Sequence, residues 1–163
     1  MLARVRASDC QNGWLSSGDE LSTAVLNVLG DCYVRESQHA MRYRQHAERI
    51  HRPEFRQELL HIAAEEQKHA ASVALQIQML HGRIPEVIPV HVAKEQNLWQ
   101  YLRTDLEEEE RCAEELREDL LLVLGKSSEI ARLLHRIDED CKSHRLRIRA
   151  MLADTDPLSP GPP

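Results

Sequence analysis

The sequence predicts an all-α protein, a four-helix bundle with a long crossover between its second and third helices. Two observations support this prediction: long segments repeat apolar residues every three or four positions, and prolines interrupt the chain at few points. Only 6 glycines occur among 163 residues, which argues against a turn-rich all-β fold. A chain of this length fits one domain.

The first helix is expected over about Gly18–His51, after an N-terminal extension of residues 1–16. Ser17 and Glu20 have the spacing of a capping box, in which the hydroxyl and the carboxylate each accept a hydrogen bond from a free backbone N–H at the helix start. No proline interrupts this stretch. The bundle as a whole is expected over residues 17–153.

The second helix is expected over about Pro53–His81. Proline suits the first turn of a helix because its missing N–H is not needed there. Gly82 follows as a C-terminal stop. Residues 83–94 contain two prolines and several β-branched residues, so we expect an extended connection.

The third helix is expected over about Glu95–Leu124, with Gly125 as its stop. Ser127 then caps a fourth helix that runs to about Ala153. Residues 154–163 are rich in proline, so they cannot continue the helix and are expected to form a disordered tail.

The lengths of the connections indicate how the helices are arranged. Short turns join the first helix to the second and the third to the fourth, so each pair is expected to be antiparallel. The middle connection of about a dozen residues can reach ~40 Å when extended. The second helix is ~43 Å long, so this connection can run back along almost the whole bundle. A simple up-and-down topology remains open, because a long loop need not cross over.

Each expected helix has an apolar stripe that is interrupted near its middle by residues able to bind metals. The interruptions are Glu36 and His39, Glu66 and His69, Glu109 and Cys112, and Cys141 and His144. A carboxylate in a bundle core costs several kcal/mol unless it is paired or coordinated. No Lys or Arg lies on the stripes near these positions, and two divalent cations would supply four positive charges. The four stripes together predict a metal site.

Each of these residues also has a simpler interpretation. A single Glu-x-x-His pair, such as Glu66 and His69, arises by accident in long helices. His39 alone is typical of a core histidine, although it is a further candidate ligand. Cys32 and Cys112 are typical of small buried apolar residues. The metal interpretation is favoured because the interruptions coincide on four helices.

Three segments resemble the ferritin-like superfamily, specifically its bacterioferritin and rubrerythrin branch. They are YRQHA at residues 43–47, preceded by Glu36; AEEQKHA at residues 64–70, followed by LHGRIP; and DLEEE at residues 105–109. The resemblance covers about residues 20–150. It implies a dinuclear metal site, expected to hold two iron ions, with the ligands Glu36, Glu66, His69, Glu109 and His144.

The main departure from the family lies three residues before His144. The family has a bridging Glu at this position, and this chain has Cys141. A Cys141 thiolate would keep the negative charge as an atypical ligand but would shift the metal preference. Other interpretations remain open: Asp140 replaces the missing Glu, His39 supplies the ligand, or the site holds one metal. A Cys112–Cys141 disulfide is not expected, because packed helices rarely bring Cα atoms within ~7 Å.

Three further departures narrow the function that the resemblance implies. Bacterioferritins carry a haem-binding Met directly after the ligand Glu of the second helix, and this chain has Gln67, so we expect no haem. The proline-rich tail cannot form the short fifth helix of the storage cages. There is also no rubredoxin-like cysteine module in the sequence.

The resulting hypothesis is a metal-binding protein with a dinuclear, iron-containing carboxylate site that reacts with O2 or peroxide, an oxidoreductase of the ferroxidase or peroxidase type. The alternative is a non-catalytic bundle with a degenerate or mononuclear site, acting as an interaction or sensing module. Cys141 favours the alternative, and the three core glutamates favour the first hypothesis. Whether the protein is an enzyme therefore stays open at this point.

Composition excludes several other partners. A formal charge of −6 and an aromatic content of 4% argue against nucleic-acid binding. No apolar run reaches the ~20 residues of a membrane span, and the first residues lack the apolar stretch of a signal peptide. We therefore expect a cytoplasmic protein with reduced cysteines. The resemblance implies a homodimer.

Overall fold

The computed structural model describes residues 17–92, 97–155 and 158, and for residues 17–21 it describes the backbone alone. Within these residues it contains four helices and no strand. The helices are α1 (Ser17–Arg49), α2 (Pro53–Met79), α3 (Leu98–Val123) and α4 (Ser128–Ala153). The expected all-α four-helix fold is confirmed. The N-terminal extension of residues 1–16 and most of the expected tail lie outside the described residues.

The helix ends differ from the expected ones by a few residues. Arg52 has extended backbone angles immediately before Pro53, so α1 ends earlier than expected. The third helix begins at Leu98 because Asn97 forms a capping box with Gln100, whereas the expected start, Glu95, lies outside the described residues. The side chains of the expected capping box at the start of α1 also lie outside them.

The end of α2 is formed by two residues with different roles. His81, rather than Gly82, adopts the left-handed backbone conformation, with a φ of 57°. The backbone N–H of Gly82 then donates to the carbonyl of Ile77 at 2.8 Å. A Cβ atom on Gly82 would lie 2.5 Å from a methyl group of Leu26, so glycine lets this turn approach α1 closely.

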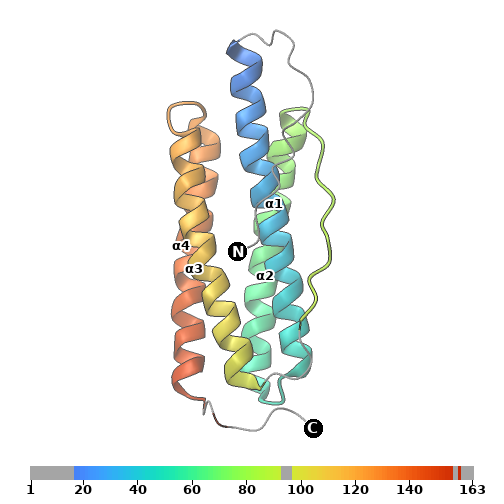
Figure 1. Ribbon diagram of the computed structural model, residues 1–163, viewed down its shortest axis with the longest axis vertical. Coiled ribbons are helices and arrows are strands. Elements are labelled where there is room, and N and C mark those ends of the chain that lie inside the picture. Colours follow the sequence, from blue (N-terminus) through green and yellow to red (C-terminus); the bar gives the residue numbers. More distant parts are fainter. Residues whose placement is uncertain (1–16, 93–96, 156–157, 159–163) are drawn as a thin grey trace.

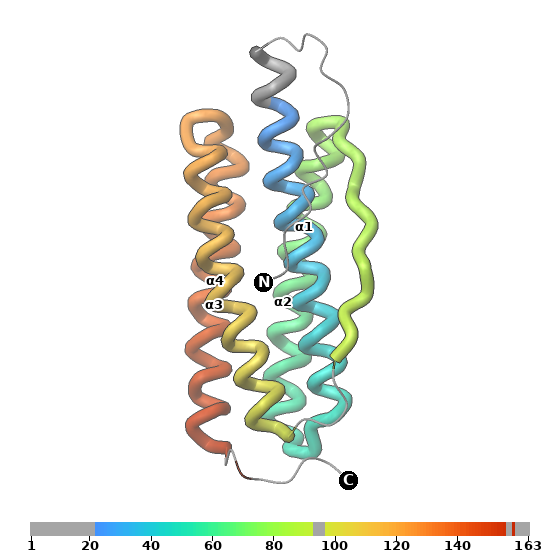
Figure 2. The backbone as a smooth tube through the Cα atoms, viewed as in Figure 1, coloured from blue at the N-terminus to red at the C-terminus, as the bar shows by residue number. Residues whose placement is uncertain are grey.

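The connection between α2 and α3 crosses the length of the bundle (Figure 1). It runs back along α1, so that α2 and α3 point in the same direction while α1 and α4 point in the opposite one. Two glutamines of α1 hold it: Gln38 donates to the carbonyl of Ile88 at 3.3 Å, and Gln45 to that of Val90 at 2.8 Å. The tube in Figure 2 shows the same course. The crossover is confirmed, and the simple up-and-down alternative is wrong.

The core consists of two apolar clusters at the two halves of the bundle. One contains residues such as Leu29, Val73, Leu116 and Leu134, and the other contains Leu59, Leu102 and Ile148. On every helix the glutamate and histidine interruptions lie in the chain between members of the two clusters, whereas Cys112 and Cys141 belong to the first cluster. Leu80, which follows the last residue of α2, lies outside both clusters and is 37% exposed. None of the helices in the described part of the chain combines the length and apolarity needed to cross a membrane.

Candidate metal centre

Acidic and imidazole side chains from all four helices are buried in the middle of the bundle. Glu36, Glu66, Glu109 and His144 have no exposed surface. His39 is 2% exposed and His69 is 8% exposed. Carboxylates in such a position are strongly unfavourable unless positive charge compensates them. The predicted polar layer is therefore present, and its members face each other.

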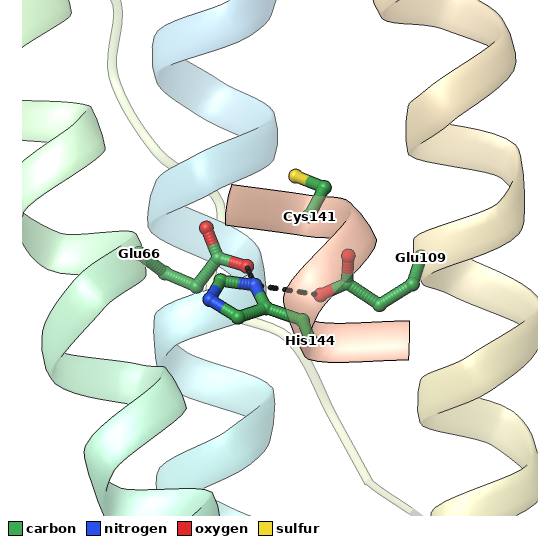
Figure 3. Close-up of side chains that lie close together, drawn as sticks. All are labelled: Glu66, Glu109, Cys141 and His144. Atoms are coloured by element: carbon green, nitrogen blue, oxygen red, sulfur yellow. Dashed lines mark hydrogen bonds and ion pairs between the residues drawn. The ribbon is translucent and has the colours of Figure 1, made fainter. Parts of the chain in front are cut away.

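A first donor group consists of Glu66, Glu109, Cys141 and His144, which point toward one another in Figure 3. Each residue offers one ligand atom, and these atoms lie within 4.8 Å of one another. Nδ1 of His144 lies 3.1 Å from Oε1 of Glu66 and 3.6 Å from Oε1 of Glu109. This is the spacing of donors that surround one cation.

A second donor group consists of Glu36, Glu66 and His69, with ligand atoms again within 4.8 Å of one another. Nδ1 of His69 lies 3.1 Å from Oε2 of Glu36 and 3.1 Å from Oε2 of Glu66. Glu66 therefore belongs to both groups: its Oε1 faces His144 and its Oε2 faces His69. One carboxylate that gives one oxygen to each of two groups is the arrangement of a bridging ligand.

Two buried atoms of the candidate donor residues have no hydrogen-bond partner. They are Nδ1 of His39 and Oε2 of Glu109. Nδ1 of His39 lies 3.8 Å from Oε1 of Glu66 and 3.9 Å from Oε1 of Glu109. Buried polar groups are nearly always satisfied, so unpartnered atoms beside two carboxylates fit a centre that accepts a cation. The donor set, which is rich in carboxylate oxygen and imidazole nitrogen, suits iron, manganese or zinc.

The pKa values of the histidines indicate which groups compensate the negative charge of the glutamates when no metal is bound. Burial alone would lower their pKa values, but the surrounding carboxylates raise the pKa of His69 to about 11 and that of His144 to about 10. The pKa of His39 rises to about 9, chiefly through Glu66. Protonated imidazoles therefore supply positive charge in the metal-free protein.

The two central glutamates differ in acidity. Burial and the neighbouring Glu66 raise the pKa of Glu36 to about 7. Burial also acts on Glu66, but hydrogen bonds to His144 and His69 outweigh it and hold the pKa of Glu66 well below its ordinary value. The shared glutamate is therefore the anionic centre of the layer.

The outer nitrogens of His69 and His144 both contact carboxylates. Nε2 of His69 lies 2.9 Å from Oδ2 of Asp140, and Nε2 of His144 lies 3.2 Å from Oε2 of Glu65. Arg147 donates to Glu65 at 2.6 Å. Such contacts fix the ring orientation of a metal-binding histidine. The Asp140 side chain is 61% exposed and lies outside the donor groups, so the structure does not bring it to the position of the missing Glu.

Sequence reasoning missed a buried pair next to the site. Nδ1 of His46 lies 2.8 Å from Oδ2 of Asp105, and the His46 ring packs at 4.6 Å from the ring of Tyr101. Neither residue was identified as a site residue from the sequence, although a buried acid such as Asp105 needs a partner. Tyr43, which is buried in the core, donates to Oε1 of Glu109 at 2.5 Å.

Sequence reasoning also missed a buried cation. Arg35 is 8% exposed, and its Nε lies 3.7 Å from Oε1 of Glu36. Its two terminal nitrogens donate to Glu115 at 3.0 Å and to Asp119 at 3.1 Å. No Lys or Arg was expected on the stripes themselves, and this cation reaches Glu36 from beside one. Arg35 sits off the apolar stripe, and its long side chain reaches inward from the edge of α1.

Three buried cysteines are free: Cys32, Cys112 and Cys141. The absence of a Cys112–Cys141 disulfide agrees with the prediction. Sγ of Cys112 lies 3.8 Å from Oε1 of Glu36. A hydrogen bond with Cys112, together with burial, raises the pKa of the Cys141 thiol well above its ordinary value. Cys141 is therefore a neutral thiol until a cation replaces its proton.

Comparison with solved structures identifies the fold of this chain. The chain is similar to a bacterioferritin of Desulfovibrio desulfuricans, described with a diiron site, at 22% identity and a TM-score of 0.77, covering 85% of this chain and 84% of that one. It is similar to Mycobacterium tuberculosis bacterioferritin BfrA at 20% identity and a TM-score of 0.74, covering 80% and 85%. A ferritin-like, diiron-carboxylate protein of Bacillus anthracis matches at 17% identity and a TM-score of 0.70, covering 85% and 99%.

No protein-family model matches the sequence, and no characterised protein matches it by sequence. These three solved structures are each below a quarter identical, so they show the fold alone. The chain has the ferritin-like four-helix fold, as the three resembling segments implied.

Proposed function

We propose that this ferritin-like bundle is a dinuclear metal protein that holds two iron ions and reacts with O2 or peroxide, as an oxidoreductase of the ferroxidase or peroxidase type. The ligands in this proposal are Glu36, Glu66, His69, Glu109 and His144, with Cys141 as an atypical sixth. The single observation that supports it best is the position of Glu66, whose two oxygens face two separate donor groups.

The charges of the donors agree with two divalent ions. Three buried carboxylates and one thiolate carry four negative charges, and two divalent cations carry four positive ones. In the metal-free protein the raised pKa values of the histidines supply this charge as protons. Metal ions would replace those protons, because only a neutral imidazole can bind a metal.

When bound, a pair of redox-active ions would supply electrons to the oxidant. The residues of this chain prepare the site for that chemistry. Asp140 and Glu65 orient the two ligand histidines through their outer nitrogens. Tyr43 holds one oxygen of Glu109, and the apolar clusters on either side keep bulk water away.

The proposal also covers the partners and the location. We propose a site without haem, because Gln67, where bacterioferritins have a haem-binding Met, is exposed and accepts a hydrogen bond from Arg44 at 3.3 Å. A cytoplasmic homodimer is the expected form. Light scattering of the purified chain tests the dimer, and the absorption spectrum of the protein as isolated tests the absence of haem.

Anaerobic titration of the metal-free protein with ferrous iron, followed by exposure to O2 or peroxide, tests the function. We expect binding to saturate at two ions per chain and the bound ferrous iron to be oxidised faster than free iron in the same buffer. Glu107→Gln, at an exposed position of α3, serves as a matched control that keeps both properties. Saturation at one ion without faster oxidation would favour the non-catalytic, mononuclear alternative, for which Cys141 is the supporting observation.

A further inference from the structure

The two donor groups that share Glu66 are chemically different. We call the group of Glu36, Glu66 and His69 the carboxylate position, and the group of Glu66, Glu109, Cys141 and His144 the thiol position. The carboxylate position offers two carboxylates and one imidazole. The thiol position offers two carboxylates, one imidazole and one sulfur. These donors therefore favour two ions in unlike surroundings over a symmetric pair.

A second observation distinguishes the thiol position. Among the candidate donor residues, the two buried atoms without a hydrogen-bond partner, Nδ1 of His39 and Oε2 of Glu109, both belong to or border this position, whereas the unpartnered Nε of the Arg35 cation borders the carboxylate position. Nδ1 of His39 is within 4 Å of the carboxylate oxygens of Glu66 and Glu109, at 3.8 and 3.9 Å. The thiol position thus has at least one donor more than the carboxylate position and an additional imidazole beside it.

The donor types determine which ions each position prefers. Thiolate sulfur is soft and favours zinc, cobalt or ferrous iron over manganese or magnesium. Zinc in particular is bound by four donors drawn from Cys, His and carboxylates, which is the composition found here. Carboxylate oxygens with a single imidazole accept harder ions such as manganese.

We propose that the two positions bind different ions with different affinities: the thiol position takes one thiophilic divalent ion first, and the carboxylate position takes a second, harder and more exchangeable ion. This inference rests on the proposed dinuclear function and adds that the two ions are inequivalent. A pair of iron ions in this site would accordingly have unlike surroundings.

The other buried cysteines provide matched controls. Cys112 is the nearest alternative thiol, but its sulfur lies 3.8 Å from Oε1 of Glu36, and it is not a member of either donor group. Cys32 packs in the apolar cluster of the same half of the bundle. Replacing each of the three cysteines by serine therefore separates the ligand from its buried neighbours.

Titration of the metal-free full-length protein with Co2+ tests the inference, because a cobalt–thiolate bond absorbs in the near ultraviolet. We expect the first equivalent to produce this absorption and the second to bind, by equilibrium dialysis, without increasing it. One equivalent of Zn2+ should then displace cobalt from the thiol position and remove the absorption. One Mn2+ ion should still bind at the carboxylate position. Cys141→Ser should lose the absorption and bind the first ion at least ~10-fold more weakly, whereas Cys112→Ser and Cys32→Ser should keep both properties.

Several outcomes overturn the inference. Two cobalt ions bound to the wild type without the absorption, or an absorption lost in Cys112→Ser and kept in Cys141→Ser, would contradict the thiol position while leaving the dinuclear proposal intact. No retained cobalt in the wild type would overturn both. If Cys141→Ser does not fold, as judged by circular dichroism, Cys141→Glu provides the second variant, which should bind two ions without the absorption.

Discussion

Substituting Glu66 by Gln is the most informative perturbation of the metal-free protein. The change keeps the shape of the side chain and removes its charge. Glu66 accepts from His69 and His144 at 3.1 Å each, and His39 lies 3.8 Å away. All three histidines have raised pKa values, so they are left as buried cations with one carboxylate fewer.

The expected change in the free energy of unfolding follows from the contacts that Glu66 loses and the repulsion that it no longer causes. Removing one partner from a buried ion pair costs about 3 kcal/mol or more. Relief of the repulsion between Glu66 and Glu36 offsets part of this cost, because Glu66 is one cause of the raised pKa of Glu36. The amide oxygen of Gln also keeps one acceptor. We therefore expect a net loss of about 2 kcal/mol in the free energy of unfolding at pH 7.

Urea denaturation of both proteins, without metal and with saturating Mn2+, measures the effect. Metal at about 100 times its Kd stabilises the wild type by ~2.7 kcal/mol per independent ion, and the variant should lose most of this stabilisation with its bridging ligand. Glu107→Gln, which removes an exposed pair with Arg103, should change stability by less than about 0.5 kcal/mol. An unchanged metal response in Glu66→Gln would refute the bridging role.

Three further predictions concern protons and the residues around the site. Metal binding at pH 8 should release about one proton from each of His69 and His144, since their pKa values of about 11 and 10 keep them protonated until a cation binds. Calorimetry in buffers of different ionisation enthalpy measures this proton release. A binding heat that does not depend on the buffer would contradict it. The metal-free protein should lose stability as pH rises, because the pKa of His69 is raised from 6.5 to about 11, so that its contribution is complete below pH 6.5 and disappears by pH 11. His69→Gln should flatten this part of the stability profile, and an equally steep decline in the variant would show that other groups cause it. Tyr43→Phe should cost about 1–2 kcal/mol, because Glu109 loses its hydrogen bond at 2.5 Å; thermal unfolding that matches the wild type would mean that this bond contributes nothing.

Periodicity predicted the inward face of each helix because burial in a bundle follows the helical repeat. Glu36, Glu66, Glu109 and His144 could be identified in this way, since each occupies a position where an apolar residue belongs. The crossover could not be deduced from the length of the connection alone. Its direction depends on contacts such as those that Gln38 and Gln45 make with carbonyls of the crossover, and no local pattern encodes them.

The residues that could not be predicted from the sequence share one property. Each lies beside the apolar stripe of its helix, and its side chain reaches into the core from there. Arg35 reaches Glu115 and Asp119 through a long side chain, and His46 meets Asp105 from a neighbouring helix. Whether such a side chain points inward depends on the rotation of the helices relative to one another. A buried acid such as Asp105, for which the sequence offers no partner on its own stripe, is the signal that would have prompted a search for His46.

The central claim is that anionic side chains lie in the dry interior of this bundle because two cations bind between them. Anomalous scattering from a crystal grown with Mn2+ or Fe2+ tests it most directly. The account predicts two peaks per chain, one on each side of the Glu66 carboxylate. A single peak away from Glu66, or a crystal structure in which Glu36, Glu66 and Glu109 face solvent, would contradict it.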